Sequence, residues 1–293
     1  MELRVLQYFL AVTREQSITG AAEALHLSQP TLSRQLRDLE EELGKQLFIR
    51  GKRQITLTEE GMLLRKRAQE ITELVQKTEN EIALSAEVIA GDITVGAGET
   101  DGMRLLAKSV CTLQAEHPLI HFHIVSGDRV DVAEDLDRGL LDFGLMFGQI
   151  DVSKYEYIQL PYQDTWGVIM RKDAPLAKKD AITAKDLIDK PLLVSRQAFC
   201  KNELREFFGN EHDKLNIVAT YNLIFNGSLM VDEGMGYALS FDKLINVTGE
   251  SNLCFRPLTP TVKSAPYLVW KKYQVFTKAA TKFLQTLQET IQE

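Results

Sequence analysis

The fold of the N-terminal region is decided by residues 17–44, which read SITGAAEALHLSQPTLSRQLRDLEEELG. Ser17 fits the N-cap of a helix over residues 18–25, and Ser28 fits the N-cap of a second helix that stops at Gly44. Two helices joined by so short a turn predict a helix-turn-helix motif.

The second helix of this motif has two different faces. Leucines recur along one face in steps of 4, 3 and 4 residues, which predicts a buried stripe made of Leu32, Leu36, Leu39 and Leu43. The opposite face is basic and hydroxyl-bearing in its N-terminal half, and the acidic residues 40–42 lie at its far end. A recognition helix usually enters the major groove of DNA by its N-terminal end. The outward side chains expected to face DNA are therefore Pro30, Thr31, Ser33, Arg34 and Arg37.

Short elements flank this motif on both sides. Apolar residues at helical spacing predict a first helix over residues 3–15. Residues 45–50 and 54–57 have the pattern of two strands joined by a tight basic turn, Gly51-Lys52-Arg53. A helix-turn-helix followed by a basic hairpin is a winged helix, whose wing can reach phosphates or the minor groove. The wing side chains expected to do so are Arg50, Lys52 and Arg53.

One long helix is predicted over residues 58–89, with Thr58 as its N-cap. A heptad seam follows it for more than three repeats and consists of Leu64, Ala68, Ile71, Val75, Thr78, Ile82, Ser85 and Ile89. Such a seam favours pairing with the same helix of a second copy, and a dimer would place two recognition helices on an inverted repeat. Packing of the seam against the chain's own domain is the alternative.

Strands and helices alternate through the rest of the chain. The first unit has strands near 93–96, 120–125 and 142–147 and helices near 102–116 and 131–139, a rhythm that predicts a mostly parallel, doubly wound sheet. A second α/β unit has strands near 165–170, 192–195, 216–220 and 237–240. The chain is expected to cross between them at Leu160-Pro161 and Ser264-Ala265-Pro266. Two lobes with two crossings resemble periplasmic solute-binding proteins, which hold their ligand in a cleft.

At 293 residues the chain is long enough for several cores. The expected fold is α/β with an N-terminal winged helix-turn-helix, a long linker helix and a two-lobed effector domain. The expected segments are the winged helix at 1–58, the linker and dimerisation helix at 59–90, effector lobe I at 91–161 plus 266–293, and effector lobe II at 162–265.

A ligand of an open α/β sheet binds beyond the carboxyl ends of the strands, at helix N-termini. The residues expected there are Glu99, Thr100, Ser126, Phe147, Ser195, Arg196, Asn226 and Ser228. Hydroxyls and free amides at helix starts suit a small carboxylate or other anion, with Arg196 as a counter-charge. The alternative for each Ser and Thr is that it only caps a helix.

Several runs in the first sixty residues carry a family resemblance. They are Phe9-Leu10-Ala11-Val12, Ala21-Ala22-Glu23-Ala24-Leu25, Leu27-Ser28-Gln29-Pro30 and Leu57-Thr58-Glu59-Glu60-Gly61. Together they resemble the LysR-type transcriptional regulators, although Gly20 departs from the family pattern of a larger residue. The resemblance implies that Gln29, Pro30, Thr31, Ser33 and Arg34 face the major groove and that Arg50 and Arg53 serve the wing. It also implies dimerisation through the linker helix, pairing of dimers into tetramers, and an effector domain that residues 135–136, 139–144 and 231–236 resemble more loosely.

Charge and composition narrow the class of protein. The net charge of −7 argues weakly against a nucleic-acid partner, but residues 45–57 hold four basic residues and no acidic one. No run of about 18 apolar residues exists, so no membrane partner is expected. Three scattered cysteines fit free thiols in the reducing cytoplasm.

Three weaker signals lead to no site. His117, His121 and His123 suggest a metal site, and His121 and His123 would share one face of a strand, but no third ligand with a convincing spacing follows them. Cys200 has no partner cysteine nearby for redox sensing. No nucleophile motif, paired-carboxylate signature or dinucleotide loop is present, so neither an enzyme nor a cofactor is expected.

These patterns predict a cytoplasmic transcriptional regulator that binds double-stranded DNA as a dimer or tetramer and responds to a small, anionic effector. RNA polymerase is a candidate further partner. Two alternatives stay open, namely a solute-binding module whose N-terminus only oligomerises and an enzyme that uses the cleft.

Overall fold

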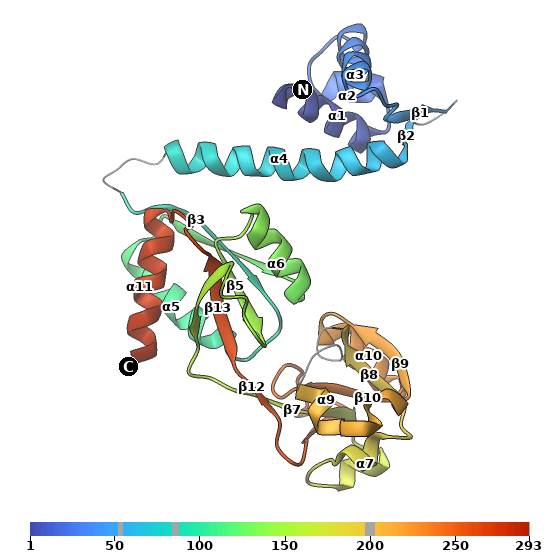
Figure 1. Ribbon diagram of the computed structural model, residues 1–293, viewed down its shortest axis with the longest axis vertical. Helices are drawn as coiled ribbons and strands as arrows, with labels where there is room; N and C mark the ends of the chain where they lie inside the picture. The colour runs from blue at the N-terminus through green and yellow to red at the C-terminus, as the bar shows by residue number, and fades with distance from the viewer. Residues whose placement is uncertain (52–54, 84–87, 197–202, 293) are drawn as a thin grey trace. The chain divides into compact units, whose positions relative to one another are not determined.

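The computed structural model describes residues 1–51, 55–83, 88–196 and 203–292, so Lys52, Arg53 and Cys200 lie outside the described residues. The chain forms two compact units, Met1–Ser85 and Ala86–Glu293 (Figure 1). Among the helices of the described ranges, none is both long and apolar enough to cross a membrane.

The N-terminal unit begins with three helices at the predicted positions, α1 (Leu3–Glu15), α2 (Ile18–Ala24) and α3 (Gln29–Leu43). The Ser17 hydroxyl accepts a hydrogen bond from the Gly20 N–H at 3.2 Å, and the Ser28 hydroxyl accepts one from the Thr31 N–H at 3.3 Å. Gly44 ends α3 with a left-handed φ of 63°. Both predicted N-caps and the predicted helix stop are therefore confirmed.

The predicted hairpin and the start of the long helix are also present. Strands β1 (Phe48–Arg50) and β2 (Ile55–Leu57) pair antiparallel, with Phe48 opposite Leu57. Helix α4 (Glu59–Ala83) follows, and the Thr58 hydroxyl accepts a hydrogen bond from the Gly61 N–H at 3.0 Å. Strand β1 begins at Phe48 rather than at the predicted residue 45, because its pairing with β2 begins there.

Buried side chains from the helices and the hairpin form the core of this unit. Leu32, Leu36 and Leu39 are at most 3% exposed, as the leucine stripe predicted. The prediction was wrong for Leu43, which is 41% exposed. Leu43 shares the face of the other leucines, but it is the last residue of α3 and lies where the helix ends.

The heptad seam of α4 is buried near its start and exposed further along. Ala68 is fully buried in the core of the N-terminal unit, and Leu64 packs against the same core. Further along, Ile71 and Ile82 are exposed. Ile89 does not continue the helix, because residues 88–90 are not helical, and it packs against the core of the second unit instead. The first part of the seam therefore packs against the chain's own domain.

Lobe I of the second unit is a five-stranded sheet covered by helices (Figure 1). Its elements are β3 (Gly91–Ala97), α5 (Met103–Glu116), β4 (Ile120–Ser126), α6 (Arg129–Arg138), β5 (Phe143–Phe147), β6 (Tyr155–Gln159), β13 (Pro266–Lys271) and α11 (Lys278–Gln292). The strand order is β4-β3-β5-β13-β6, in which β3, β4 and β5 are parallel and β13 runs antiparallel to both of its neighbours.

Lobe II is a second mixed sheet. Its strands are β7 (Asp164–Arg171), β8 (Leu192–Ser195), β9 (Ile217–Tyr221), β10 (Tyr237–Phe241), β11 (Leu253–Pro257) and β12 (Lys263–Ser264), and its helices include α7 (Ala184–Leu187), α9 (Glu203–Phe208) and α10 (Ile224–Asp232). The order is β11-β7-β10-β8-β9, with β12 paired to β7. Strands β8, β9 and β10 are parallel, and β7 runs antiparallel to β10, β11 and β12.

The mostly parallel sheet predicted for lobe I is confirmed in strand direction, since β3, β4, β5 and β6 all run the same way, and β8, β9, β10 and β11 do so in lobe II. The exceptions among these sheet neighbours are β13 in lobe I and β7 in lobe II, which run antiparallel to the strands beside them. The reason lies in where the chain enters each lobe. Strands β13 and β7 begin at the crossings and run away from them, whereas β5 and β10, which they neighbour, run in the opposite direction. Strands β6 and β11, which the alternating pattern did not show, complete the antiparallel edges.

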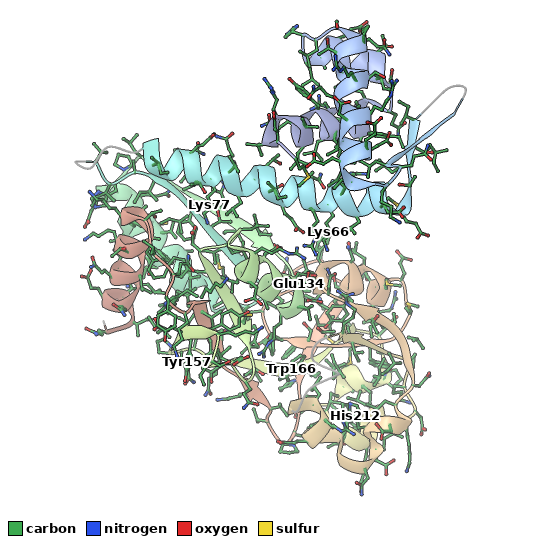
Figure 2. All side chains as sticks on the ribbon, turned by 45° about the horizontal axis from the view of Figure 1, so that its top comes forward. Lys66, Lys77, Glu134, Tyr157, Trp166 and His212 are labelled. Carbon is green, nitrogen blue, oxygen red and sulfur yellow. The ribbon has the colours of Figure 1, made fainter. Side chains whose placement is uncertain are left out.

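The two crossings between the lobes lie side by side and are held by hydrogen bonds. The Leu160 N–H donates to the carbonyl of Pro266 at 3.0 Å. The indole N–H of Trp166, labelled in Figure 2, donates to the Ser264 hydroxyl at 2.9 Å. A pocket of about 450 Å³ opens along the first crossing and is lined by Gln159, Leu160, Pro161, Tyr162 and Gln163.

Asp164, at the start of β7, is a buried carboxylate that receives a hydrogen bond from lobe I. It is 2% exposed, and the Thr100 hydroxyl donates to its Oδ2 at 2.5 Å. Burial raises the pKa of Asp164 to about 6, against an ordinary value of 3.8, although the Thr100 hydrogen bond acts in the opposite direction. The ionised carboxylate is thus destabilised where the chain crosses between lobes.

A methyl group added to Gly61 would lie 2.1 Å from the carbonyl oxygen of Leu47, whereas one added to Gly20 would meet no atom closer than 3.6 Å. We expect Gly61→Ala to lower the free energy of unfolding of the N-terminal unit by about 1–3 kcal/mol, since the backbone of the wing must move. Gly20→Ala, the matched control in α2, should raise it by about 0.5–1 kcal/mol. Urea unfolding followed by far-ultraviolet circular dichroism tests both. Equal effects would contradict the close approach at Gly61.

The raised pKa of Asp164 predicts a pH-dependent stability. The folded chain keeps this proton up to about pH 6 and the unfolded chain releases it near 3.8, so the folded state gains stability as the pH falls through this window. Asp164→Asn removes this gain, and its free energy of unfolding relative to wild type should be about 2 kcal/mol lower at pH 4.5 than at pH 7. Both tryptophans, Trp166 and Trp270, lie in the second unit, so their fluorescence follows its unfolding. Parallel pH profiles for the two proteins would contradict the prediction.

Candidate functional site

The face of α3 expected to meet DNA is open to solvent. Gln29, Pro30, Thr31, Arg34 and Arg37 are exposed, and Ser33 is half-buried on the flank. The Arg34 side chain is 82% exposed and lies 3.9 Å from Asp38, one turn further along the helix. This weak, solvated ion pair leaves the guanidinium available to another anion.

The Thr31 hydroxyl is partly engaged inside the protein. It lies 2.7 Å from the Ser28 hydroxyl, whose oxygen also caps the helix. This contact fixes the first turn of α3, which is the turn expected to enter the groove. Ser28 therefore caps α3, as predicted, while Thr31 remains exposed at the same turn.

The acidic end of α3 is built into the unit rather than presented to a ligand. The Glu40 carboxylate accepts hydrogen bonds from the N–H groups of Leu47 and Phe48 at 2.7 and 3.2 Å, which sets the start of the wing. The N-terminal amino group of Met1 contacts Glu42 at 2.5 Å. Sequence reasoning missed the role of Glu40, because its partners are backbone groups seven and eight residues away.

The wing places Arg50 at the end of β1, opposite Ile55. The two other predicted wing residues, Lys52 and Arg53, lie outside the described residues. The exposed Ile49 precedes Arg50 on the same strand. Roles of the three basic side chains therefore stay predictions.

In the second unit, loops at the carboxyl ends of strands from the two lobes meet. We call this meeting of loops the interlobe site, defined by Glu99, Thr100, Asp101, Asp128 and Phe147 of lobe I and by Tyr162, Asp164, Arg196, Ile224, Phe241 and Lys243 on the crossing and lobe II. Four of the eight residues predicted to bind an effector belong to it, namely Glu99, Thr100, Phe147 and Arg196.

Glu99 reaches from lobe I to the start of a helix in lobe II. Its carboxylate accepts a hydrogen bond from the backbone N–H of Ile224, the first residue of α10. Desolvation raises the pKa of Glu99, and the backbone N–H groups of Ile224 and Phe225 act in the opposite direction. Glu99 thus supplies the acceptor that the helix start needs from the other lobe.

Next to Glu99, Asp101 connects lobe I to the crossing and to lobe II. The Tyr162 hydroxyl donates to its Oδ2 at 3.1 Å, and Nζ of Lys243 lies 3.5 Å from the same oxygen. Arg104 donates to Oδ1 at 2.6 Å. These partners lower the pKa of Asp101, although desolvation opposes them. Tyr162 and Lys243 were missed by sequence reasoning, since no linear spacing relates them to Asp101.

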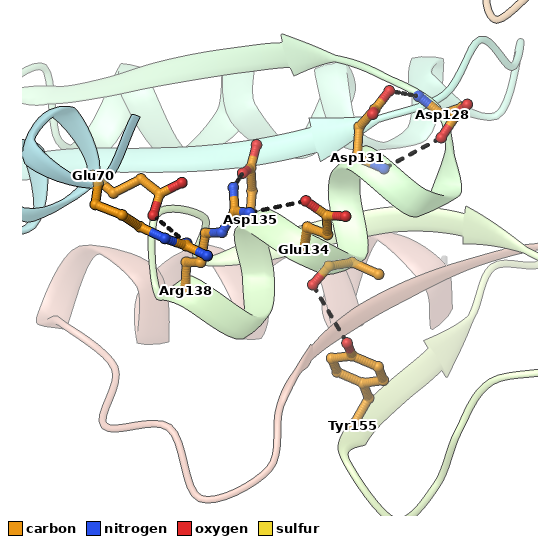
Figure 3. Close-up of polar contacts among 9 residues, drawn as sticks. Glu70, Asp128, Asp131, Glu134, Asp135, Arg138 and Tyr155 are labelled. Carbon is orange, nitrogen blue, oxygen red and sulfur yellow. Dashed lines mark hydrogen bonds and ion pairs between the residues drawn. The ribbon is translucent and has the colours of Figure 1, made fainter. Parts of the chain in front are cut away.

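Asp128 and Arg196 form a second charged contact between the lobes. The Arg196 guanidinium donates to Oδ2 of Asp128 at 2.8 Å, and Asp128 is 3% exposed. The other oxygen of Asp128 accepts from the N–H groups of Val130 and Asp131, which completes a capping box with Asp131 at the start of α6 (Figure 3). Arg196, expected as a counter-charge for an anion, is therefore already paired with a carboxylate of the chain.

The remaining predicted effector residues are not brought into these contacts. Ser126 and Asn226 are exposed, and Ser195 is buried at the end of β8. Ser228 is 2% exposed, and its hydroxyl donates to the carbonyl of Phe225 within its own helix at 2.7 Å. Phe147 does reach the other lobe, where its ring lies 4.9 Å from that of Phe241.

The histidines considered for a metal lie at the β3–β4 edge. His123 and His121 lie 3.2 and 3.7 Å from the same oxygen of Asp92, all three on the surface. Within the described ranges, no group of three or more His, Cys, Asp or Glu side chains is arranged to hold a metal ion. Cys200, considered for redox sensing, lies outside the described residues.

Known proteins match both units. The family described as "Bacterial regulatory helix-turn-helix protein, lysR family" matches residues 3–62, and "LysR substrate binding domain" matches residues 86–292. The chain is 31% identical over 298 residues to the Hca operon transcriptional activator HcaR of Escherichia coli, which covers 99% of this chain and 98% of that protein. It is 33% identical over 219 residues to the HTH-type transcriptional regulator BsdA of Bacillus subtilis, 74% of each chain.

The fold is shared with solved structures. Full-length CbnR, crystallised in complex with its target DNA, superposes with a TM-score of 0.76 at 19% identity, covering 99% of this chain and 100% of that one. The winged helix with its exposed α3 face and the two-lobed unit are thus the two halves of one known architecture. The chain belongs to the LysR family of bacterial transcriptional regulators.

Proposed function

We propose that this LysR-family regulator reads DNA with the N-terminal half of α3. The observation that carries this proposal is the exposed basic and hydroxyl face of a helix whose opposite face is locked into a core by Leu32, Leu36 and Leu39. Side chains of Gln29, Thr31, Ser33 and Arg34 would contact base edges, while Arg37, Arg50, Lys52 and Arg53 would neutralise phosphates. Pro30 would fix the first turn that enters the groove.

A dimer through α4 would place two copies of α3 on an inverted repeat. The support is a stripe of exposed apolar residues on one side of α4, made of Leu63, Ile71, Leu74 and Ile82. An apolar stripe of this kind favours burial against a second helix. Segments 1–58 and 59–90 would then act as the DNA reader and the dimerisation helix, and dimers could pair further into tetramers.

The second unit would bind a small-molecule effector between lobe I, residues 91–161 plus 266–293, and lobe II, residues 162–265. The support is that Glu99, Asp101, Asp128 and Phe147 all contact residues of the other lobe or its crossing. A ligand that enters here must rearrange these contacts, which changes how the lobes meet and, through α4, how the dimer presents α3. We place this activity in the cytoplasm, without catalysis and with RNA polymerase as a further partner at the promoter.

The DNA proposal is tested with labelled DNA from the gene's own upstream region, at about 0.15 M salt with excess competitor DNA. Arg34→Ala should weaken specific binding by about tenfold to a hundredfold, because a base-edge contact is worth about 1–3 kcal/mol. Arg4→Ala is the control: it removes the same charge from the start of α1, which the Met1–Glu42 contact places near the far end of α3. An equal loss of specific DNA binding in both variants would mean that Arg34 contributes only its positive charge and no base-edge contact. Failure of wild type to bind this DNA, or any DNA selected from a random pool, would favour the solute-binding alternative.

The dimer proposal is tested by placing a charge on the stripe. Leu74, which is 42% exposed, becomes Glu in one variant, and Gln69, exposed on the opposite side of α4, becomes Glu in the control. Leu74→Glu should raise the dimer dissociation constant at least about tenfold, since a carboxylate would have to be desolvated in the pairing. Gln69→Glu should leave it unchanged. Sedimentation velocity measures both, and identical assembly of the two variants would contradict pairing through this face.

A further inference from the structure

Lobe II offers two positively polarised groups to the interlobe site, and the chain itself fills both. One is the start of α10, where free backbone N–H groups carry partial positive charge. The other is the guanidinium of Arg196. The carboxylate of Glu99 takes the first and the carboxylate of Asp128 takes the second, both from lobe I.

The N-cap residue of helix α10 does not cap the start of this helix. Its N-cap residue is Leu223, an apolar side chain that makes no capping hydrogen bond. The residue that accepts from the Ile224 N–H is instead Glu99, which is 125 positions away in the sequence. A small anion would ordinarily bind at such a helix start, so Glu99 stands where the carboxylate of a ligand would be expected.

Lys243 and Arg196, the cations of lobe II at the interlobe site, pair with carboxylates other than Glu99. Lys243 is paired with Asp101, and Arg196 is paired with Asp128. In the parts of the chain that the structure describes, no Lys or Arg lies within ion-pair distance of Glu99. Desolvation raises the pKa of this carboxylate, as expected for an acid that is half-buried without a cation. A ligand carboxylate would therefore meet like charge at this position.

We infer that Glu99 determines the charge of the effector: the interlobe site accepts a neutral or cationic ligand and rejects a carboxylate, because Glu99 holds the anion position at the start of α10. This inference rests on the proposed function, in which the effector binds between the lobes. It departs from the anionic effector that the sequence predicted from hydroxyls and helix starts, since the donors of α10 and Arg196 are engaged by the chain's own carboxylates.

The variant that isolates this charge is Glu99→Gln. Its side-chain carbonyl keeps the shape and the acceptor for the Ile224 N–H, so α10 remains capped, while the negative charge is lost. Glu116→Gln is the matched control, because Glu116 is an exposed carboxylate at the end of α5 in the same lobe. Far-ultraviolet circular dichroism and the tryptophan fluorescence of the full chain confirm that both variants fold.

The probes are benzamidinium, benzamide and benzoate, which share one shape and carry positive, zero and negative charge near neutral pH. Their binding to the full chain is measured by saturation-transfer NMR and calorimetry. In wild type and Glu116→Gln, benzoate should bind at least about tenfold more weakly than benzamide. In Glu99→Gln the ratio of benzoate to benzamide affinity should rise at least about tenfold. A merely structural role of Glu99 would change all three affinities alike and leave this ratio unmoved.

Three results would overturn the inference: wild type binding benzoate as tightly as benzamide, an unchanged ratio in Glu99→Gln, or no binding of any probe to either protein. The proposed function is judged separately by retention of promoter DNA in the absence of probe. A wild type that retains the DNA but fails the charge comparison keeps its function as a regulator and loses only the role of Glu99.

Discussion

The unpaired N–H groups at the start of every helix are the constraint on which much of this structure depends. Each helix start must find acceptors, and the chain supplies them at two ranges. In the N-terminal unit the acceptors are local: Ser17 caps α2 and Ser28 caps α3. Between the lobes the acceptor is distant, because Glu99 serves α10. The local caps fix the starts of α2 and α3 within the N-terminal unit, and the distant one makes a helix of lobe II depend on lobe I.

Four carboxylates lie where the lobes meet, and they differ in whether a cation or only hydrogen-bond donors contact them. Asp128 pairs with Arg196 and Asp101 with Lys243, so these two are compensated by charge. Asp164 and Glu99 accept hydrogen bonds but form no ion pair within the described residues, Oδ1 of Asp164 is buried there without a hydrogen-bond partner, and burial raises the pKa of both carboxylates. A buried carboxylate that contacts hydrogen-bond donors but no cation costs free energy to ionise. A change in charge near Glu99 or Asp164 is therefore expected to alter the hydrogen bonds that these residues make between the lobes.

Helix α4 shows why a periodic pattern can be read in two ways. A heptad seam specifies an apolar side of a helix but not which surface covers it. Ala68 and Leu64 are covered by the chain's own core, whereas Ile71 and Ile82 of the same seam remain exposed. One seam therefore joins the DNA-binding core to the face that we propose for dimerisation. A change at one end of the seam is expected to affect folding of the N-terminal unit, and a change at the other end to affect assembly.

The sequence by itself determined the features that depend on near neighbours. Periodicity and capping act over three or four residues, so α1, α2, α3, the wing and the parallel strands β3, β4 and β5 follow from it, as does the outward face of Arg34. Only the tertiary structure decided the antiparallel strands β13 and β7, the exposure of Leu43, and the pairing of Arg196 with Asp128 and of Glu99 with α10. These contacts join residues 68 and 125 positions apart. No local spacing encodes them, because they form only when two separately folded lobes bring their strand ends together.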